Sequence, residues 1–255
     1  MPEIQATTQD RIRILTISNE AKRNAMEGTM PAELLRLFDA ADADSSIRVV
    51  VVTGAGDVAF SSGHDLKDIA SGAFARTGLG ETPVLRPLSM KKPVVAAVNG
   101  HCYAAALILA MSCDLRVVSE NATFGSPGVR LGMLPEGGQI GRLPLLMSRA
   151  AALELMLTGA PLRAREAFVA GFACRLVPSG QALASALVLA AEIAKNSPAV
   201  VSAVKRGVLF GEQHGVAKAE GFERENARLL ETQPDAVEGV EAFFHKRQPV
   251  FADLA

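Results

Sequence analysis

Runs of apolar, β-branched residues that alternate with helical stretches constrain the fold of this chain more than any other feature. Residues 48–53 read RVVVVT and end in a Gly-Ala-Gly-Asp turn, and residues 93–98 form a second apolar run before a helical stretch over residues 104–112. Strands that read as continuous apolar runs are typical of parallel sheets covered on both faces. Their alternation with helices predicts right-handed βαβ units, and therefore an α/β fold.

The predicted elements divide the chain into two regions. Strands are also expected at residues 11–17 and 114–118, a helix at residues 31–41, and a mobile loop in the glycine-rich residues 72–80. Beyond Gly180 the pattern is helical throughout, with helices predicted at residues 181–195, 198–210, 216–230 and 234–245. We therefore expect the first two-thirds to be α/β and the last third to be a helical cap. The boundary is placed so that residues 1–195 form the core and residues 196–255 a C-terminal helical region.

Composition and charge exclude several classes of function. A net charge of −1 and the lack of a Lys/Arg-rich run argue against nucleic acid as a partner. Residues Ala182–Ala194 are apolar but short and include Glu192, so we expect a buried helix and no membrane span. No signal peptide is visible near the N-terminus. The three cysteines lack metal-ligand spacing, which favours a reducing, cytoplasmic setting and no metal site.

Three short segments of small residues carry the functional signal. They are residues 60–67 (FSSGHDLK), the Asn-Gly at residues 99–100 that leads into residues 103–106 (YAAA), and residues 124–127 (FGSP). In their order and spacing they resemble the crotonase family of enoyl-CoA hydratases and isomerases, over residues 12–251. The resemblance implies a crotonase-like spiral of β-β-α units. It also implies an acyl-CoA thioester as substrate, no separate cofactor, and a homotrimer or dimer of trimers built through the C-terminal helices.

The resemblance further implies an oxyanion hole formed by the backbone N–H groups of His64 and Ala105. An acyl thioester gathers negative charge on its carbonyl oxygen as an enolate forms, and two fixed backbone donors stabilise that charge without side-chain rearrangement. The family usually has three glycines where Ala104, Ala105 and Ala106 stand here. We expect alanine to adopt helical angles at these positions, and its methyl groups to narrow the acyl pocket.

A second group of residues is implied in CoA binding. Residues 21–25 (AKRNA) match the family segment whose backbone meets the adenine, and basic residues elsewhere are candidate phosphate contacts. Ordinary solvated surface charge is the competing interpretation for each basic residue. The predicted contacts are Lys22, Arg23, Ala25, Asp65, Leu66, Lys67 and Lys246.

The identity of the base is the open chemical question. Hydratases of the family use two glutamates, but the matching positions here are Ile108 and Gly128, which cannot transfer a proton. The chain thus resembles a divergent branch that lacks both. Glu136 lies in the sequence LPEGG, where a subset of the isomerases carries its catalytic glutamate. Glu136 is therefore the predicted base, and a first-turn helix carboxylate favoured by the helix dipole is the alternative.

These assignments favour double-bond isomerisation of an enoyl-CoA, with Glu136 moving a proton between C2 and C4. Hydration by a different residue set is the second interpretation, and acyl-CoA binding without turnover is the third. His101 is expected to be a packed or surface residue. Tyr103 has two open interpretations, a hydroxyl for the pocket or core packing. Asp114 is expected to be structural.

Overall fold

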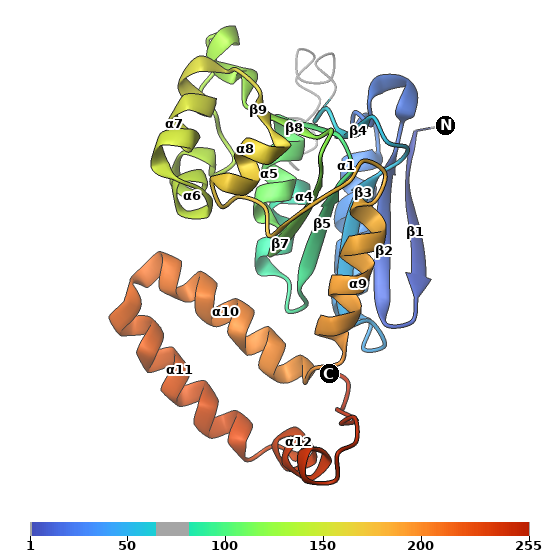
Figure 1. The fold of residues 1–255 in the computed structure, drawn as a ribbon, viewed down its shortest axis with the longest axis vertical. Helices are drawn as coiled ribbons and strands as arrows, with labels where there is room; N and C mark the ends of the chain where they lie inside the picture. The colour runs from blue at the N-terminus through green and yellow to red at the C-terminus, as the bar shows by residue number, and fades with distance from the viewer. Residues whose placement is uncertain (1, 65–81, 255) are drawn as a thin grey trace.

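The computed structural model describes residues 2–64 and 82–254 and builds them around two β-sheets (Figure 1). In the six-stranded sheet, ordered β1-β2-β3-β5-β7-β10, β1 and β2 are antiparallel and the other neighbours are parallel. Its strands are β1 (Glu3–Gln9), β2 (Ile12–Ser18), β3 (Val49–Gly54), β5 (Val94–Val98), β7 (Leu115–Ser119) and β10 (Arg175–Val177). Four of them, β2, β3, β5 and β7, are the predicted strands. The loop predicted at residues 72–80 lies outside the described residues.

A second, four-stranded sheet gives the fold its repeating unit. Its strands, in the order β4-β6-β8-β9, are β4 (Ala59–Ser61), β6 (His101–Tyr103), β8 (Thr123–Gly125) and β9 (Leu162–Arg163). Each of β4, β6 and β8 directly follows a strand of the larger sheet along the chain. Strand β6 leads into α5 (Ala105–Ser112), and β8 leads into the 3₁₀ segment η3 (Pro127–Leu131). The chain thus repeats a long strand, a short strand and a helical segment.

Two hydrophobic clusters lie on opposite faces of the larger sheet. On one face Val50 and Val52 of β3 pack with α1 (Met30–Ala43), α4 (Thr82–Leu85) and α5. On the other face Val49 and Val51 pack with α9 (Ala182–Ala194), which buries its Ala182, Ala186 and Ala190. Alternate residues of one strand thus enter opposite cores, which explains why the sequence reads as a continuous apolar run. Helix α9 thus covers this face of the larger sheet (Figure 1).

The middle of the chain contains helices that periodicity did not predict. They are α6 (Gln139–Leu146), α7 (Arg149–Thr158) and α8 (Ala164–Val169). They lie beside the smaller sheet, with α8 next to β8 and β9 (Figure 1). Two further 3₁₀ segments are η1 (Glu20–Lys22) and η2 (Arg86–Ser89).

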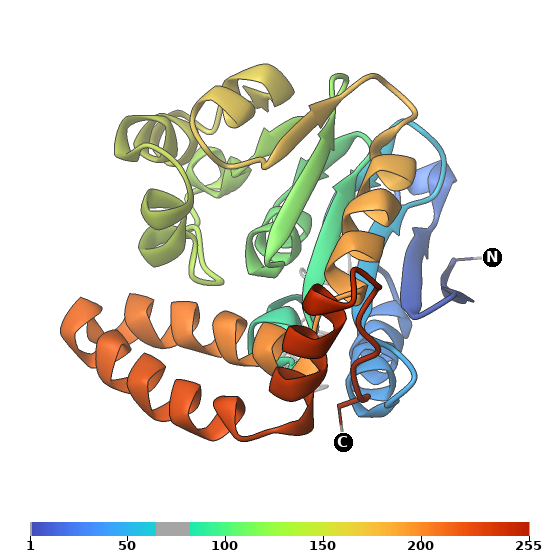
Figure 2. The same cartoon turned by 60° about the horizontal axis from the view of Figure 1, so that its bottom comes forward.

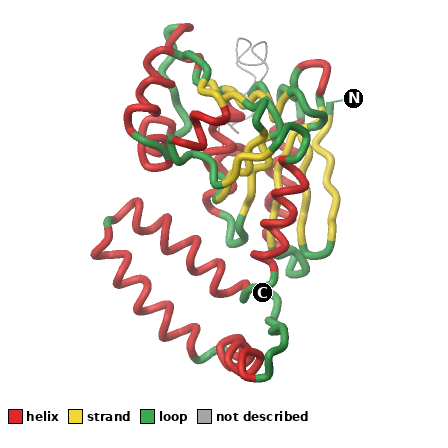
Figure 3. Tube along the Cα trace, viewed as in Figure 1, coloured by secondary structure: helices red, strands yellow, loops and turns green. Residues whose placement is uncertain are grey.

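The last helices, α10 (Pro198–His214), α11 (Val216–Glu231) and α12 (Pro234–Phe244), extend away from both sheets (Figures 2 and 3). Helix α10 is tied to the core by Lys205, whose Nζ donates to the Pro87 carbonyl at 2.7 Å and to Asp114 Oδ2 at 2.8 Å. No single helix among the described residues has both the length and the apolar content needed to cross a membrane; α9 and α10 together meet the test only as a pair bent by 110°.

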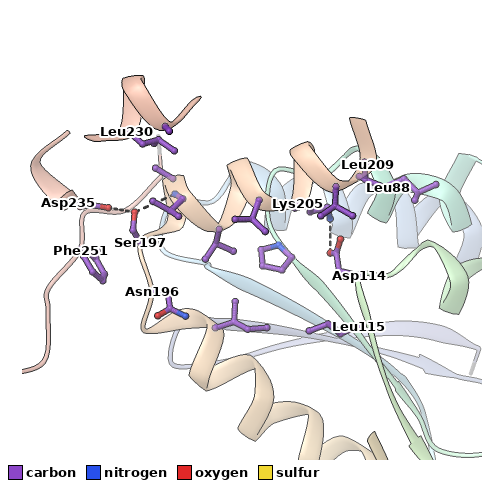
Figure 4. A pocket seen from close by; sticks show the side chains of 18 of the residues that line it. Leu88, Asp114, Leu115, Asn196, Ser197, Lys205, Leu209, Leu230, Asp235 and Phe251 are labelled. Atoms are coloured by element: carbon purple, nitrogen blue, oxygen red, sulfur yellow. Dashed lines mark hydrogen bonds and ion pairs between the residues drawn. The ribbon is translucent and has the colours of Figure 1, made fainter. Parts of the chain in front are cut away.

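A cleft of about 990 Å³ separates the C-terminal helices from the core (Figure 4). Its walls come from the end of α5, from α6 and from α10 to α12. Figure 4 shows the Lys205–Asp114 ion pair at one end and the hydrogen bond between Ser197 and Asp235 at the other. Much of the wall is aliphatic, and Val204 and Val208 of α10 are more than half exposed, at 61% and 59%. The cleft is therefore an apolar surface that this chain does not cover by itself.

Candidate functional site

The loop after β4 and the beginning of α5 meet backbone against backbone. A Cβ placed on Gly63 would lie 2.9 Å from the Tyr103 carbonyl oxygen and 3.0 Å from the Ala105 nitrogen, and Gly63 has a φ of +92°. Both facts restrict this position to glycine. The Gly63 carbonyl accepts a hydrogen bond from Met26 N at 2.8 Å, and Met26 also forms a parallel bridge with His64. The structure thus brings together the His64 and Ala105 segments, which the sequence places far apart.

The turn into α5 holds alanine in an unusual conformation. Ala104 has φ 52° and ψ −119°, a combination that residues other than glycine rarely adopt. The expectation of helical angles is therefore wrong for Ala104, whereas Ala105 and Ala106 are helical. Hydrogen bonds hold the turn, because Ala104 N donates to Gly125 O at 2.9 Å and Ala104 O accepts from Ile108 N at 3.1 Å. Ala105 is the first residue of α5, where backbone N–H groups and the helix dipole favour an anion.

Glu136 lies in a turn that packs on the same helix. Its neighbour Gly137 faces Ile108, since a Cβ on Gly137 would lie 2.9 Å from Ile108 Cγ1. Ile108 is one helical turn beyond Ala105. The Glu136 side chain is exposed, and its carbonyl accepts a hydrogen bond from the Gln139 side chain at 3.0 Å. The turn that contains Glu136 therefore packs on Ile108, one of the two positions where the resemblance implies a hydratase glutamate.

Gly128, the other position where the resemblance implies a hydratase glutamate, packs against its own loop. Gly128 O accepts a hydrogen bond from Met133 N at 2.9 Å, and a Cβ on Gly128 would lie 3.0 Å from Met133 O. That separation is tighter than most real Cβ contacts. A Cβ at residue 128 would therefore require the Met133 carbonyl to shift by a few tenths of an ångström.

The segment predicted to meet adenine lies against the β4 loop. Arg23 O accepts a hydrogen bond from Ser62 N at 3.0 Å, and Asn24 Nδ2 donates to Ala59 O at 2.7 Å. Arg23 and Asn24 both have positive φ, at 53° and 55°, so side-chain hydrogen bonds from Asn24 are needed to hold this turn.

The predicted CoA contacts are distributed unevenly. Lys22 and Arg23 are exposed, Lys22 pairs with Glu27, and the side chain of Ala25 is buried. Lys246 follows α12, at the opposite end of the molecule from β4 (Figure 1), so one copy of the chain does not bring it to the other contacts. Asp65, Leu66 and Lys67 lie outside the described residues.

A hydrogen-bonded trio on the smaller sheet supports the turn into α5. Thr123 Oγ1 lies 2.8 Å from His101 Nδ1 and 2.8 Å from the Tyr103 hydroxyl. The Tyr103 ring packs on Gly125, because a Cβ placed on Gly125 would lie 3.0 Å from Tyr103 Cγ. Tyr103 and His101 are thus packed residues on one face of β6. No pattern in the sequence marks Thr123, because its role depends on the pairing of β6 with β8.

Buried charge lies at the far end of α5. The guanidinium of Arg116 donates to the Cys113 carbonyl at 2.7 Å and the Ala110 carbonyl at 3.2 Å, and so caps the C-terminal end of the helix. Burial lowers the pKa of Arg116. Burial also raises the pKa of Asp114, against the opposing effect of its ion pair with Lys205. Burial raises the pKa of the Cys113 thiol to about 12, so this cysteine stays protonated. Asp114 is placed as expected, in a structural role.

Comparisons with known proteins agree with this architecture. The family model for enoyl-CoA hydratase/isomerase matches residues 7–254. The chain is 34% identical to the 2,3-dehydroadipyl-CoA hydratase of Escherichia coli K12, covering 98% of this chain and 99% of the relative. It is also 34% identical to the carnitinyl-CoA dehydratase of Proteus mirabilis, covering 91% and 92%. The crystal structure of an enoyl-CoA hydratase from Mycobacterium tuberculosis superimposes with a TM-score of 0.92 at 34% identity, covering 99% of each chain. The crotonase-like fold is confirmed, and the chain belongs to the enoyl-CoA hydratase/isomerase family.

Proposed function

We propose that this protein is an acyl-CoA enzyme that moves the double bond of an enoyl-CoA through an enolate. The approach of Gly63 to Ala105 carries the proposal, because it places the His64 and Ala105 backbone segments side by side. The thioester oxygen would accept hydrogen bonds from both N–H groups. Fixed donors of this kind stabilise the charge that develops as a C2 proton leaves, and each is worth about 10²- to 10³-fold in rate.

Glu136 is proposed as the base. In a 3-enoyl-CoA it would take a proton from C2, the electron pair would delocalise onto the thioester oxygen, and the proton would return at C4 to give the 2-enoyl-CoA. The contact between Gly137 and Ile108 supports this role, since it seats the Glu136 turn one helical turn from Ala105. Ile108 and Gly128 offer no second proton-transfer group, which favours a reaction that needs one base.

Hydration or dehydration is the second candidate. The names of the relatives favour it, because one is a hydratase and the other a dehydratase. Isomerisation and hydration both pass through an enolate of the thioester. Glu136 and the backbone donors would therefore serve either reaction. Acyl-CoA binding without turnover is the remaining candidate, motivated by the replacement of both family glutamates.

The decisive experiment compares wild type, Glu136→Gln and the control Glu154→Gln, which changes an exposed glutamate on α7. We expect wild type to convert a 3-enoyl-CoA to the 2-enoyl-CoA, Glu136→Gln to lose roughly 10²- to 10⁴-fold in turnover, and the control to match wild type. Exchange of C2 protons of butyryl-CoA with D₂O, followed by NMR, detects enolate formation whichever reaction is native. Saturable binding without any proton exchange would support acyl-CoA binding without turnover. Full activity in Glu136→Gln would show that Glu136 is not the base.

We also propose a homotrimer or dimer of trimers in the cytoplasm. The support is the apolar surface that the C-terminal helices leave exposed, including Phe243 at 79% and Phe244 at 75%. Light scattering at micromolar concentration tests it, and a monomer mass would contradict it.

A further inference from the structure

Ala104 keeps a backbone conformation that alanine does not ordinarily adopt. Its φ is 52° and its ψ is −119°, outside the regions open to most residues with a side chain. Such angles persist only where the surrounding structure imposes them. The ψ angle of Ala104 also sets the plane of the peptide that carries the N–H group of Ala105, one of the two proposed oxyanion donors. Whatever holds Ala104 therefore also aims that donor.

Tyr103, which directly precedes Ala104, is held at its backbone and at its side chain. Strand pairing places it opposite Gly125, whose carbonyl accepts a hydrogen bond from Ala104 N at 2.9 Å. Its ring packs on Gly125, where a Cβ would lie 2.5 Å from Tyr103 Cε1. Its carbonyl oxygen faces Gly63, and its hydroxyl lies 2.8 Å from Thr123 Oγ1. Both ends of Tyr103 are therefore fixed, and the hydroxyl end depends on Thr123.

Thr123 joins Tyr103 to a second ring. Its Oγ1 also lies 2.8 Å from His101 Nδ1, and the His101 ring stacks on the Tyr103 ring with centroids 5.7 Å apart. A threonine hydroxyl has one hydrogen and two lone pairs, so it serves both partners only if at least one of them donates to it. The arrangement of the two rings therefore depends on a single hydroxyl group, that of Thr123.

We propose that Thr123, acting through Tyr103, is a positioning residue for the oxyanion hole. Its hydroxyl fixes the far end of the Tyr103 side chain, and Gly125 fixes the ring. The Tyr103 backbone then cannot turn to release the strain at Ala104. The inference rests on the oxyanion hole proposed above, but not on Glu136 or on the choice between isomerisation and hydration. If Thr123 only stabilised the pairing of β6 with β8, its removal would change stability and leave the donor in place.

The test compares wild type with three variants. Thr123→Val keeps the branched shape and strand preference of threonine without the hydroxyl, whereas Thr123→Ser keeps the hydroxyl. Tyr103→Phe removes the other side of the same hydrogen bond and keeps the ring on Gly125. Thr8→Val, at an exposed threonine of the edge strand β1, is the matched control.

Two measurements report on the donor and not on stability. The first is the infrared frequency of the ¹³C-labelled thioester carbonyl in bound butyryl-CoA at ligand saturation, and the second is the rate at which its C2 protons exchange with D₂O. We expect the lowering of the carbonyl frequency in wild type to shrink in Thr123→Val and Tyr103→Phe. Exchange in both should slow by up to about 10²-fold, the cost of misplacing a reacting group by about 1 Å. Thr123→Ser should restore most of both signals, and Thr8→Val should match wild type.

The outcomes separate this inference from the one on which it rests. If wild type lowers the carbonyl frequency and Thr123→Val and Tyr103→Phe lower it equally, the positioning role is overturned and the oxyanion hole stands. A signal lost in Thr123→Val and not restored in Thr123→Ser also overturns it, because the threonine methyl group is then what matters. If Thr123→Val does not fold, Tyr103→Phe decides alone. If saturated wild type leaves the frequency as it is in water, the oxyanion hole itself fails, and this inference with it.

Discussion

Direct backbone contact holds the turns around Gly63 and Ala104, whereas a few side-chain contacts hold the C-terminal helices. At Gly63 the backbone atoms of two loops touch, and the geometry leaves no room for a methyl group. Helix α10 instead reaches the core through the buried Lys205, beside an open apolar cleft. A turn held by backbone contact, such as the proposed oxyanion turn, tolerates almost no displacement, whereas a helical region held at a few points can have its position set by a partner. Variants on either side test this contrast.

The largest effect is expected at the attachment of α10. Lys205→Met would leave the half-buried Asp114 without its cation, and breaking a buried ion pair costs at most about 3–5 kcal/mol. Chemical denaturation measures the loss. The double variant Lys205→Met/Asp114→Asn should recover much of it, because no uncompensated charge remains. A double variant as unstable as the single one would show that packing, and not charge, anchors α10.

The loss of stability in Lys205→Met should depend on pH. Burial raises the pKa of Asp114 above its ordinary value of 3.8, so the stability cost of its negative charge develops as the pH rises above 3.8 and is complete above the folded pKa. Removing Lys205 raises the pKa of Asp114 further. The stability gap between wild type and Lys205→Met should therefore be largest at neutral pH and should shrink as the pH falls toward 3.8. A gap that is constant with pH contradicts this account.

Gly63→Ala tests the proposed oxyanion turn. The added methyl must push Tyr103 O or the Ala105 amide away, and loss of one oxyanion donor lowers turnover by about 10²- to 10³-fold. Gly132→Ala is the matched control, since Gly132 also has a positive φ, of +71°, but nothing lies within 4 Å of where its Cβ would stand. The control should lose some stability and keep its turnover. Equal losses of turnover in the two variants would mean that backbone strain, and not contact, controls the site.

The fold was predictable from the sequence where the chain has long apolar patterns, and much less so where its elements are short or interrupted. Residues 48–53 and 93–98 read as buried strands because both faces of the larger sheet are covered. Strand β1 was missed because Ile4 is its one buried residue, so no alternation is visible. Strands of three residues, such as β6, are too short for any period. Helix α6 was hidden by Pro144 in its interior.

From the sequence, the candidate site could be proposed as a set of segments and not as a set of contacts. Gly63, Ala105 and Glu136 stand at positions that match family motifs. The packing of Gly137 on Ile108 and the shared hydrogen bonds of Thr123 depend on the register of distant segments, which no local pattern encodes. The positive φ of Ala104 also escaped, because alanine does not ordinarily mark such a turn.

Ala104→Gly should raise the stability of the folded state, by less than the amount that Lys205→Met is expected to lower it. Glycine removes a backbone strain of order 1–3 kcal/mol, and its extra freedom in the unfolded chain costs about 0.4–1 kcal/mol. We expect a net gain of roughly 1 kcal/mol by denaturant titration. Ala106→Gly, inside α5, should instead lose about 1 kcal/mol. The same sign in both variants would show that Ala104 is not strained.

The smallest effect is expected at the surface of the C-terminal region. Arg247 and Val250 N both donate to Glu238, and these contacts lower the pKa of that carboxyl to about 2. A depressed pKa stabilises the folded state above the ordinary value of 4.5 and the benefit disappears as the pH falls through about 2. Because this ion pair lies at the surface, where solvent screens it, Glu238→Gln should barely change the melting temperature at neutral pH. A large change in melting temperature would mean that Glu238 and Arg247 are buried in an assembly.

The most direct test of the central claim is the infrared absorption of the thioester carbonyl in bound butyryl-CoA, read with a ¹³C label at that carbon. Two backbone hydrogen bonds at the site of His64 and Ala105 polarise the C=O bond, so the account predicts a lower stretching frequency in the complex with wild type than in water. The shift should shrink in Gly63→Ala and persist in Glu136→Gln, which leaves the donors intact. A carbonyl frequency equal to that in water, at ligand saturation of wild type, would contradict the proposed oxyanion hole.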